Sequence, residues 1–139
     1  EAILDRFEWI RVGYQSEDEE QQILRKQALE LQSVSKSDAE KIVVASTRLV
    51  RATRDHDRIR RGASIRGALS LADLCAAFVH QGLDLSVAFL KAAMMALPTR
   101  IELERDVESE SDPHDQMELL LRDLAREALN GAVGSKKKT

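Results

Sequence analysis

Apolar residues recur three and four positions apart along most of this chain, and most of these runs begin just after a serine. That spacing places the apolar residues on one face of a helix, and serine is a favoured residue at helix N-caps. Aromatic residues make up only 4% of the 139 residues, so aliphatic side chains and alanine must build the core. Such a core favours helices packed on helices over a β-sandwich. The sequence therefore predicts an all-α fold, a small helical bundle in one domain.

Five segments carry the helical pattern, and each has recognisable ends. We expect helices near residues 17–31, 38–54, 65–81, 86–97 and 113–130. The expected N-caps are Ser16, Ser37 or its competitor Ser35, Ser64 and Asp112. A glutamate or aspartate three residues after the first two caps completes a capping box. The expected stops are Gly82 for the third helix, Pro98 for the fourth and Gly131 for the last, because glycine favours helix ends and proline cannot continue a helix.

The spacing also predicts which residues each helix buries. The fourth helix is expected to bury Val87, Leu90, Met94 and Leu97. The C-terminal helix is strongly amphipathic, with Met117, Leu120, Leu121, Leu124 and Ala128 on one face. Two readings of that last helix are open: it folds back and completes the core, or it docks on a partner. We favour the first.

The segments between the helices have their own character. Residues 7–14 alternate partly and end near a glycine, which predicts one short N-terminal strand. Residues 55–63 form a polar connection without a regular period, and residues 99–103 are expected to be extended. Residues 104–114 are acidic and polar and read as a linker, and the chain ends in a basic tail.

Composition and charge narrow the class of protein. Hydrophobic residues make up 43%, charged residues 32%, and the net charge is −3, which predicts a soluble globular domain. The apolar stretches are too short to span a membrane, and no basic-then-apolar leader indicates secretion. The single Cys75 cannot form an internal disulfide, which fits a reducing, cytoplasmic location. The chain opens at Glu1 inside an apolar pattern, so we expect it to be a piece of a longer protein.

The residue types that carry catalysis are sparse. His56, His80, His114 and Cys75 show no metal-ligand spacing, so no metal site is predicted, and Cys75 is expected to be a core residue. The chain has no nucleophile motif and no glycine-rich phosphate loop. By itself it offers no cradle for a nucleotide.

One feature departs from the helix rules: arginines gather at the start of the third helix. Arg60, Arg61 and Arg66 surround its N-terminus, where a cation opposes the helix dipole at a cost of roughly 0.3–1 kcal/mol. Helix N-termini and guanidinium groups both bind anions, so an anion site is one explanation. The alternative is that Asp55 and Asp57 pair with the first two arginines and Arg66 points into water.

Two motif blocks resemble those of one protein family. "EAILDRFEWIRVGYQSEDEE" is similar to the segment of MoxR-type AAA+ ATPases that reads P-E-A-x-L-D-R-F, then a strand, then V-G-Y-P-S-x-x-E-E. "LVRATRDHDRIRRGASIRGALSLADLCAAF" resembles their later segment, V-x-A-T-R followed by G-A-S-P-R-A and an alanine-rich helix. The resemblance covers about residues 1–103. Gln15 stands where the family has proline, and Ile65 and Gly67 flank Arg66 in place of proline and alanine.

The resemblance implies a domain plan and candidate site residues. Residues 1–14 would be the truncated C-terminal edge of the nucleotide-binding core and residues 15–103 the helical lid. The linker at 104–114 and the C-terminal helix and tail at 115–139 lie beyond the resemblance and complete the domain plan. Arg6 of "LDRF" matches the arginine finger, which acts on the neighbouring subunit's nucleotide. Arg66 of "GASIR" matches sensor 2. The candidate nucleotide-binding residues are Gly62 and Ser64, with Arg66.

The resemblance also implies cofactors and partners. ATP and Mg²⁺ would bind the full-length protein, with none expected on this fragment, because the Walker motifs would lie upstream. Identical subunits would form a ring, and a protein with a von Willebrand factor A domain is a possible partner in chaperone-like remodelling or metal insertion. Magnesium chelatase subunits are relatives of the family. The alternatives are a helical protein-interaction module and a nucleic-acid-binding helical domain, which the net charge of −3 disfavours.

Overall fold

The structure, a computed structural model, describes residues 14–104 and 112–134. Its elements in chain order are α2 (Glu17–Gln27), η1 (Leu29–Ser33), α3 (Lys36–Asp55), β1 (Ile59–Arg61), α4 (Ile65–His80), α5 (Leu85–Ala96), η2 (Pro98–Arg100), β2 (Glu102–Leu103) and α6 (Pro113–Gly134). The described residues are thus mostly helical, which confirms the all-α fold class. The predicted strand at 7–14 lies outside the described residues except for Tyr14, which is in no regular element.

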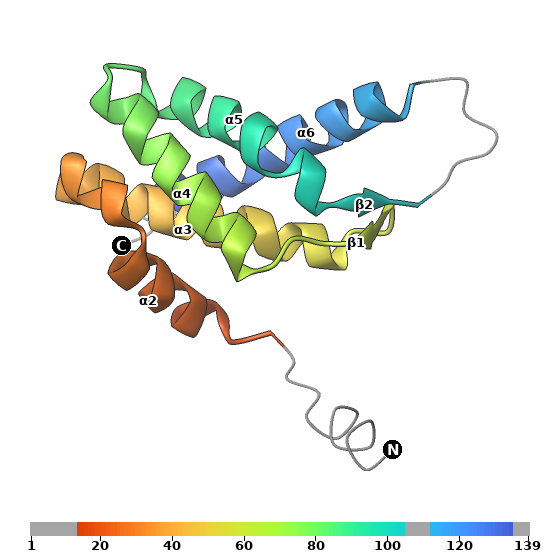
Figure 1. Ribbon diagram of the computed structural model, residues 1–139, viewed down its shortest axis with the longest axis horizontal. Coiled ribbons are helices and arrows are strands. Elements are labelled where there is room, and N and C mark those ends of the chain that lie inside the picture. Colours follow the sequence, from red (N-terminus) through yellow and green to blue (C-terminus); the bar gives the residue numbers. More distant parts are fainter. Residues whose placement is uncertain (1–13, 105–111, 135–139) are drawn as a thin grey trace, which may run out of the picture.

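Four helices close into one bundle. Helix α3 packs on α4, α4 on α5, α5 on α6, and α6 back on α3, while α2 lies outside against α3 and α4 (Figure 1). Aliphatic residues and alanines fill the centre, as the low aromatic content predicts. Phe89 is the largest of the fully buried side chains. Helix α6 therefore belongs to the core, which agrees with the favoured reading that it folds back.

Serine caps set the helix starts much as expected. The Oγ atoms of Ser16 and Ser64 accept hydrogen bonds from the backbone N–H groups of Glu19 and Arg66, at 3.2 and 3.3 Å. For α3 the cap is Ser35, whose Oγ accepts from Asp38 at 3.1 Å. Ser37, the first candidate, lies inside the helix. Because both serines have an acidic residue three positions on, the capping-box pattern could not separate them.

The first predicted helix is wrong beyond Gln27. The backbone becomes extended at Ala28 (φ −81°, ψ 92°) and then forms η1. This break allows η1 to pack on α4, where the N–H of Glu30 donates to Asp73 Oδ1 at 3.2 Å. The end of α2 is therefore decided by packing against a helix distant in the sequence, which the local spacing of apolar residues cannot predict.

The last predicted helix is wrong at its end, because α6 continues through Gly131 to Gly134. Ala132 is buried (4% exposed), so the extra turn gains core contact. Glycine lowers helix propensity by roughly 1 kcal/mol, and burial of the following residue outweighs that penalty. At its start, α6 begins at Pro113 with His114 N–H bonded to Asp112 Oδ1 at 3.1 Å. The expected cap is therefore correct. The last two residues of the predicted linker, Pro113 and His114, belong to α6.

The predicted core face of α5 is partly wrong. Val87 is 54% exposed, and Leu90 and Met94 are only partly buried. Phe89 and the alanines of α5 lie inside instead. Because α5 is apolar almost all round, its sequence does not indicate which face is buried. The face with the alanines is the buried one, since small side chains allow α5 to approach α4 closely.

Two connections pair as a small sheet. β1 and β2 are antiparallel, with Ile59 opposite Leu103, Arg61 opposite Glu102 and an irregularity between them. Residues 55–63 were expected to be irregular, so β1 corrects that prediction. Residues 99–103 were expected to be extended, which holds for β2 but not for the single turn η2. Strands this short are too short to show an alternation of apolar and polar residues, so they cannot be predicted from the sequence. They form because the two segments pair with each other.

A buried carboxylate joins α2 to α3. Glu20 is 1% exposed, and Arg54 donates to both of its oxygens, at 2.9 and 2.8 Å. Arg51 donates to Oε1 as well, at 2.7 Å, and also to the Gln15 carbonyl at 3.0 Å. The Arg54 guanidinium also lies over the Tyr14 ring, 3.7 Å from its centroid. We call this the Glu20 cluster.

Opposing effects act on the pKa of Glu20. Burial by itself would raise the pKa, but the hydrogen bonds and positive charges of Arg54 and Arg51 outweigh it and hold the pKa below its usual value of 4.5. The carboxylate is therefore ionised at neutral pH, and the two arginines satisfy it.

Replacing Glu20 by glutamine should destabilise the fold by about 3 kcal/mol, because it leaves a buried guanidinium without its anion. Glu17→Gln is the matched control in the same helix. Its partner Arg48 lies 3.4 Å away and both side chains are about 40% exposed, so a loss below about 1 kcal/mol is expected. Chemical denaturation followed by circular dichroism measures both, and equal losses would contradict a buried role for Glu20.

A comparison of the wild type with Glu20→Gln also tests the pKa of Glu20. The folded pKa is lowered, so the stabilisation is complete above the usual value of 4.5 and is lost as the pH falls through the folded value. The stability difference between the wild type and Glu20→Gln should therefore shrink below pH 4.5. A constant difference down to strongly acidic pH would contradict the lowered pKa.

Candidate functional site

The loop before α4 is held rigidly against the end of α3. The Ala63 N–H donates to Thr53 Oγ1 at 3.0 Å, and its carbonyl accepts from Arg54 Nε at 2.9 Å. Ala63 is fully buried, as is Thr53. Since Arg54 also holds Glu20, the Glu20 cluster extends directly into the loop that presents the start of α4.

Gly62 is explained by packing. A Cβ at this position would lie 2.7 Å from the Cα and the N of Arg54 and from the carbonyl oxygen of Thr53. Only glycine lets the loop approach the backbone of α3 so closely. Of the three candidate nucleotide-binding residues, Gly62 thus has a structural role, and Ser64 is the N-cap of α4.

Arg66 has no acidic partner among the described residues. Its side chain is exposed, and its backbone N–H is bonded to the Ser64 cap. The first turn of α4 contains no acidic residue, unlike the first turns of α2 and α3. Seven other arginines of the described parts do form ion pairs: Arg25, Arg48, Arg51, Arg54, Arg60, Arg61 and Arg122.

Arg60 and Arg61 differ from Arg66 because they have an acidic partner. Both pair with Glu102 of the adjacent strand, at 3.6 and 3.9 Å, and both are largely exposed. The sequence suggested Asp55 and Asp57 as their partners, and that assignment is wrong. Strand pairing between β1 and β2, invisible in the sequence, brings Glu102 to them.

Arg100 is the residue that sequence reasoning missed. Its side chain extends from η2 to the second turn of α4, where its Nη2 donates to Ser70 Oγ at 3.3 Å. A Cβ on Gly67 would lie 3.4 Å from Arg100 Cδ, an ordinary contact distance, so this side chain passes close to the backbone of α4. Ser70 follows Arg66 by four positions and therefore shares its helix face. No sequence signal marks Arg100, because only the contact of η2 with α4 places it there.

The arrangement favours a negatively charged ligand. Arg66 lies in the first turn of α4, Arg100 reaches the same helix at Ser70, and no described carboxylate forms an ion pair with either. The helix dipole adds positive potential at the start of α4. A phosphate or carboxylate there could accept hydrogen bonds from Arg66 in the geometry that guanidinium prefers.

Other candidate chemistry has no support in the described residues. No group of three or more His, Cys, Asp or Glu residues there could hold a metal ion. Cys75 is fully buried, and burial, with a smaller effect of Asp38, raises its pKa to about 12. The thiol therefore stays protonated and acts as a core side chain, as predicted. Arg6, the candidate finger, lies outside the described residues.

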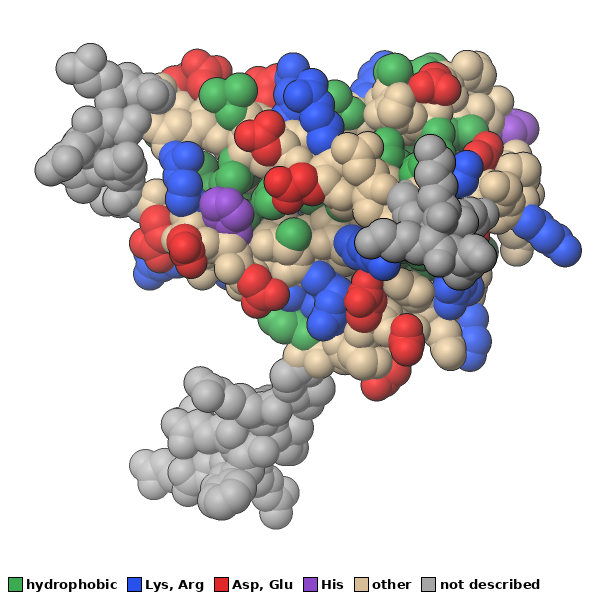
Figure 2. All heavy atoms as spheres, turned by 180° about the vertical axis from the view of Figure 1, so that it is seen from behind, with side chains coloured by type: hydrophobic (Ala, Val, Ile, Leu, Met, Phe, Trp, Pro, Cys, Tyr) green, Lys and Arg blue, Asp and Glu red, His purple; other side chains and the backbone are tan. Residues whose placement is uncertain are grey.

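The face shown in Figure 2 is not uniformly basic. Figure 2 shows Lys and Arg side chains interspersed with Asp and Glu across the visible face. Binding to nucleic acid calls for a face of one positive sign, so this face offers none. Within the described parts, no helix is both long enough and apolar enough to cross a membrane.

No protein-family model, curated protein or solved structure matches this chain. The resemblance to MoxR-type ATPases therefore depends on the two motif blocks alone.

Gly62→Ala should destabilise the protein by roughly 1–3 kcal/mol, because the added methyl group collides with backbone atoms that cannot move aside. Gly131→Ala is the control. Its Cβ would meet only the flexible end of Arg48, at 3.2 Å, and alanine in a helix interior should stabilise by roughly 0.5–1 kcal/mol. Thermal unfolding of the two variants should shift in opposite directions, and an unchanged Tm for Gly62→Ala would refute the packing role.

Proposed function

We propose that this chain is the lid of a MoxR-like AAA+ ATPase and that Arg66 contacts the phosphates of ATP held by the nucleotide-binding core. The observation that carries the proposal is Arg66 itself: a cation at the positive end of α4, exposed, with no described carboxylate to pair with. A residue that violates a local rule without local compensation is expected at functional sites.

The surroundings of Arg66 suit such a role. Electrostatic stabilisation of a phosphoryl group works best when the donor is held in place before the ligand arrives. Here the loop at 62–64 is bonded to the buried end of α3 at Ala63, so the start of α4 has little freedom.

The wider role follows from the resemblance. ATP and Mg²⁺ would bind between the core and this lid in the full-length protein. Hydrolysis in a cytoplasmic ring of identical subunits would drive chaperone-like remodelling or metal insertion in a partner, and a von Willebrand factor A domain protein is the candidate partner. The fragment by itself lacks the Walker motifs and is not expected to hydrolyse ATP.

Arg66→Ala in the full-length protein should lower kcat for ATP hydrolysis by on the order of 100-fold, the usual loss when one donor to a developing charge is removed. Arg60→Ala is the matched control, because Arg60 belongs to the same cluster in the sequence but pairs with Glu102. It should retain near wild-type turnover. Normal hydrolysis by Arg66→Ala rings would overturn the assignment, as would equal losses in both variants.

Arg6 calls for a test in trans, because a finger acts on the nucleotide of the neighbouring subunit. Arg6→Ala and Arg66→Ala subunits, each impaired by itself, should regain ATP turnover when they are mixed in one ring. Where the two meet, the Arg6→Ala subunit keeps its own Arg66 and its neighbour supplies an intact Arg6. No gain on mixing would exclude the finger role, and ion pairs with Asp5 or Glu8 would then be the alternative for Arg6.

A further inference from the structure

The chain enters the helical bundle through Tyr14 and Gln15, and both of these residues contact arginines near the end of α3. The Tyr14 ring lies over the guanidinium of Arg54, whose carbon is 3.7 Å from the ring centroid. The carbonyl of Gln15 accepts a hydrogen bond from Arg51 Nη1 at 3.0 Å. The resemblance assigns residues 1–14 to the edge of the nucleotide-binding core, so these contacts would lie at the boundary between that core and the lid.

Arg54 connects this boundary to the loop before α4. Its Nε donates to the Ala63 carbonyl at 2.9 Å, while its two terminal nitrogens hold the Glu20 carboxylate. The guanidinium group is planar and rigid, and the Arg54 side chain is only 7% exposed. A shift of the Tyr14 ring that turns this plane would therefore also displace the hydrogen bond to Ala63.

The connection continues along the chain from Ala63 to Arg66. The Ala63 N–H donates to Thr53 Oγ1 at 3.0 Å, which fixes the loop on α3. The next residue, Ser64, caps α4: its Oγ accepts from the N–H of Arg66 at 3.3 Å, and its carbonyl accepts from the N–H of Gly67 at 3.0 Å. The backbone of Arg66 therefore has little freedom to move independently of the loop that Arg54 holds.

Tyr14 contributes little to the apolar core. It is 59% exposed, whereas the Arg54 side chain beneath it is almost completely buried. An aromatic ring attracts a cation more strongly when that cation is shielded from water. The ring therefore acts on the position of Arg54 more than on the burial of apolar surface.

We propose that Tyr14 is a positioning residue, which through Arg54 fixes the start of α4, and with it Arg66, relative to the boundary between the core and the lid. The purpose of this coupling rests on the proposed contact of Arg66 with the phosphates of ATP. Stabilisation of developing charge requires a donor that is already in place. A lid arginine that follows the core boundary would stay aimed at those phosphates.

Amide hydrogen exchange of this chain measures the coupling without any ATPase activity. Tyr14→Ala should raise the exchange rate of the Ala63 N–H by roughly tenfold, because a contact between a ring and a shielded cation contributes about that factor to a local opening equilibrium. The N–H of Phe89 in α5 reports on the bundle as a whole and should change by less than about twofold. Tyr14→Phe keeps the ring and should retain the wild-type rates at both positions.

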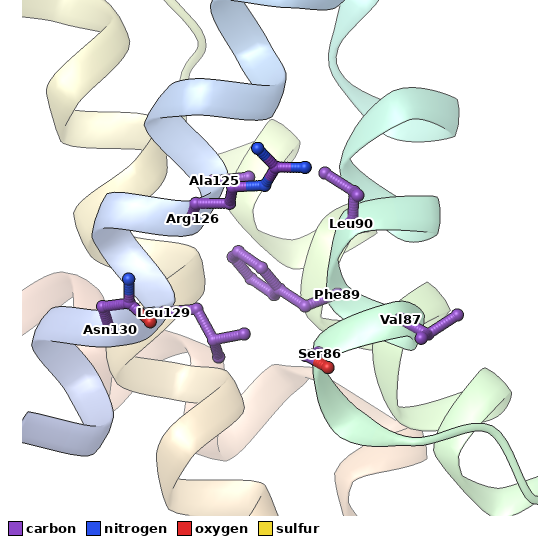
Figure 3. Close-up of a pocket in the computed structure, with 8 residues that line it drawn as sticks. All are labelled: Ser86, Val87, Phe89, Leu90, Ala125, Arg126, Leu129 and Asn130. Carbon is purple, nitrogen blue, oxygen red and sulfur yellow. The ribbon is translucent and has the colours of Figure 1, made fainter.

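Val87→Ala is the matched control. Val87 is 54% exposed, nearly as much as Tyr14, and it lines a hollow between α5 and α6 (Figure 3). Helix α5 begins at the end of the bundle away from β1 and the end of α3 (Figure 1), so the Ala63 N–H should keep its wild-type rate in this variant. The proposal is overturned if Tyr14→Ala leaves the Ala63 rate unchanged, if it accelerates Ala63 and Phe89 equally, or if Val87→Ala has the same effect.

A double-mutant cycle in the full-length protein tests the purpose of the coupling. Tyr14→Ala should lower kcat for ATP hydrolysis at least about threefold, since a small misplacement of an oriented group is costly. In the Arg66→Ala background it should have no further effect, because both substitutions act through the same contact. Tyr14→Phe should restore turnover. An equal loss in both backgrounds, or no loss in the wild-type background, would exclude an action of Tyr14 through Arg66.

The two measurements separate this coupling from the function that it would serve. Normal turnover by Arg66→Ala would overturn the phosphate contact, while faster exchange at Ala63 in Tyr14→Ala would still establish the coupling. Impaired turnover by Arg66→Ala together with unchanged exchange at Ala63 in Tyr14→Ala would support the phosphate contact and refute the coupling.

Discussion

The buried Glu20 carboxylate is the interaction on which the arrangement of this protein depends. It lies at 1% exposure between α2 and α3, and taking an ion out of water is costly unless strong hydrogen bonds replace the lost hydration. Arg54 supplies two of these bonds and Arg51 a third. The Arg54 guanidinium also donates to the Ala63 carbonyl. The Glu20–Arg54 pair therefore joins three segments: α2, the end of α3 and the loop before α4. Movement of any one of them would expose or break the pair.

This coupling gives the proposed site its physical basis. Arg66 is an exposed side chain, yet the loop that precedes it is bonded at Ala63 to Thr53 and Arg54. An arginine whose backbone is already fixed loses less conformational entropy when it binds an anion.

Much of the fold could be predicted from local chemistry. Serine caps and apolar spacing place the helix starts to within a residue or two, because these signals act within one turn of the chain. The position of Arg66 at a helix start follows from the same signals. The contact of Arg100 with α4 could not be predicted, because it depends on η2 turning back onto Ser70 of that helix. The partners of Arg60 and Arg61 were assigned wrongly for the same reason: Glu102 reaches them only through strand pairing.

By itself, the sequence determined the fold class, the starts of the helices and the unusual cation at the beginning of α4, since each depends on residues close together in the chain. The tertiary structure alone decided where α2 breaks, that α6 passes through Gly131, and which face of α5 is buried. These depend on which helix lies alongside. Any neighbour that excludes water stabilises an apolar side chain. Hydrophobicity therefore predicts that the side chain is buried, but only the packed bundle decides which helix buries it.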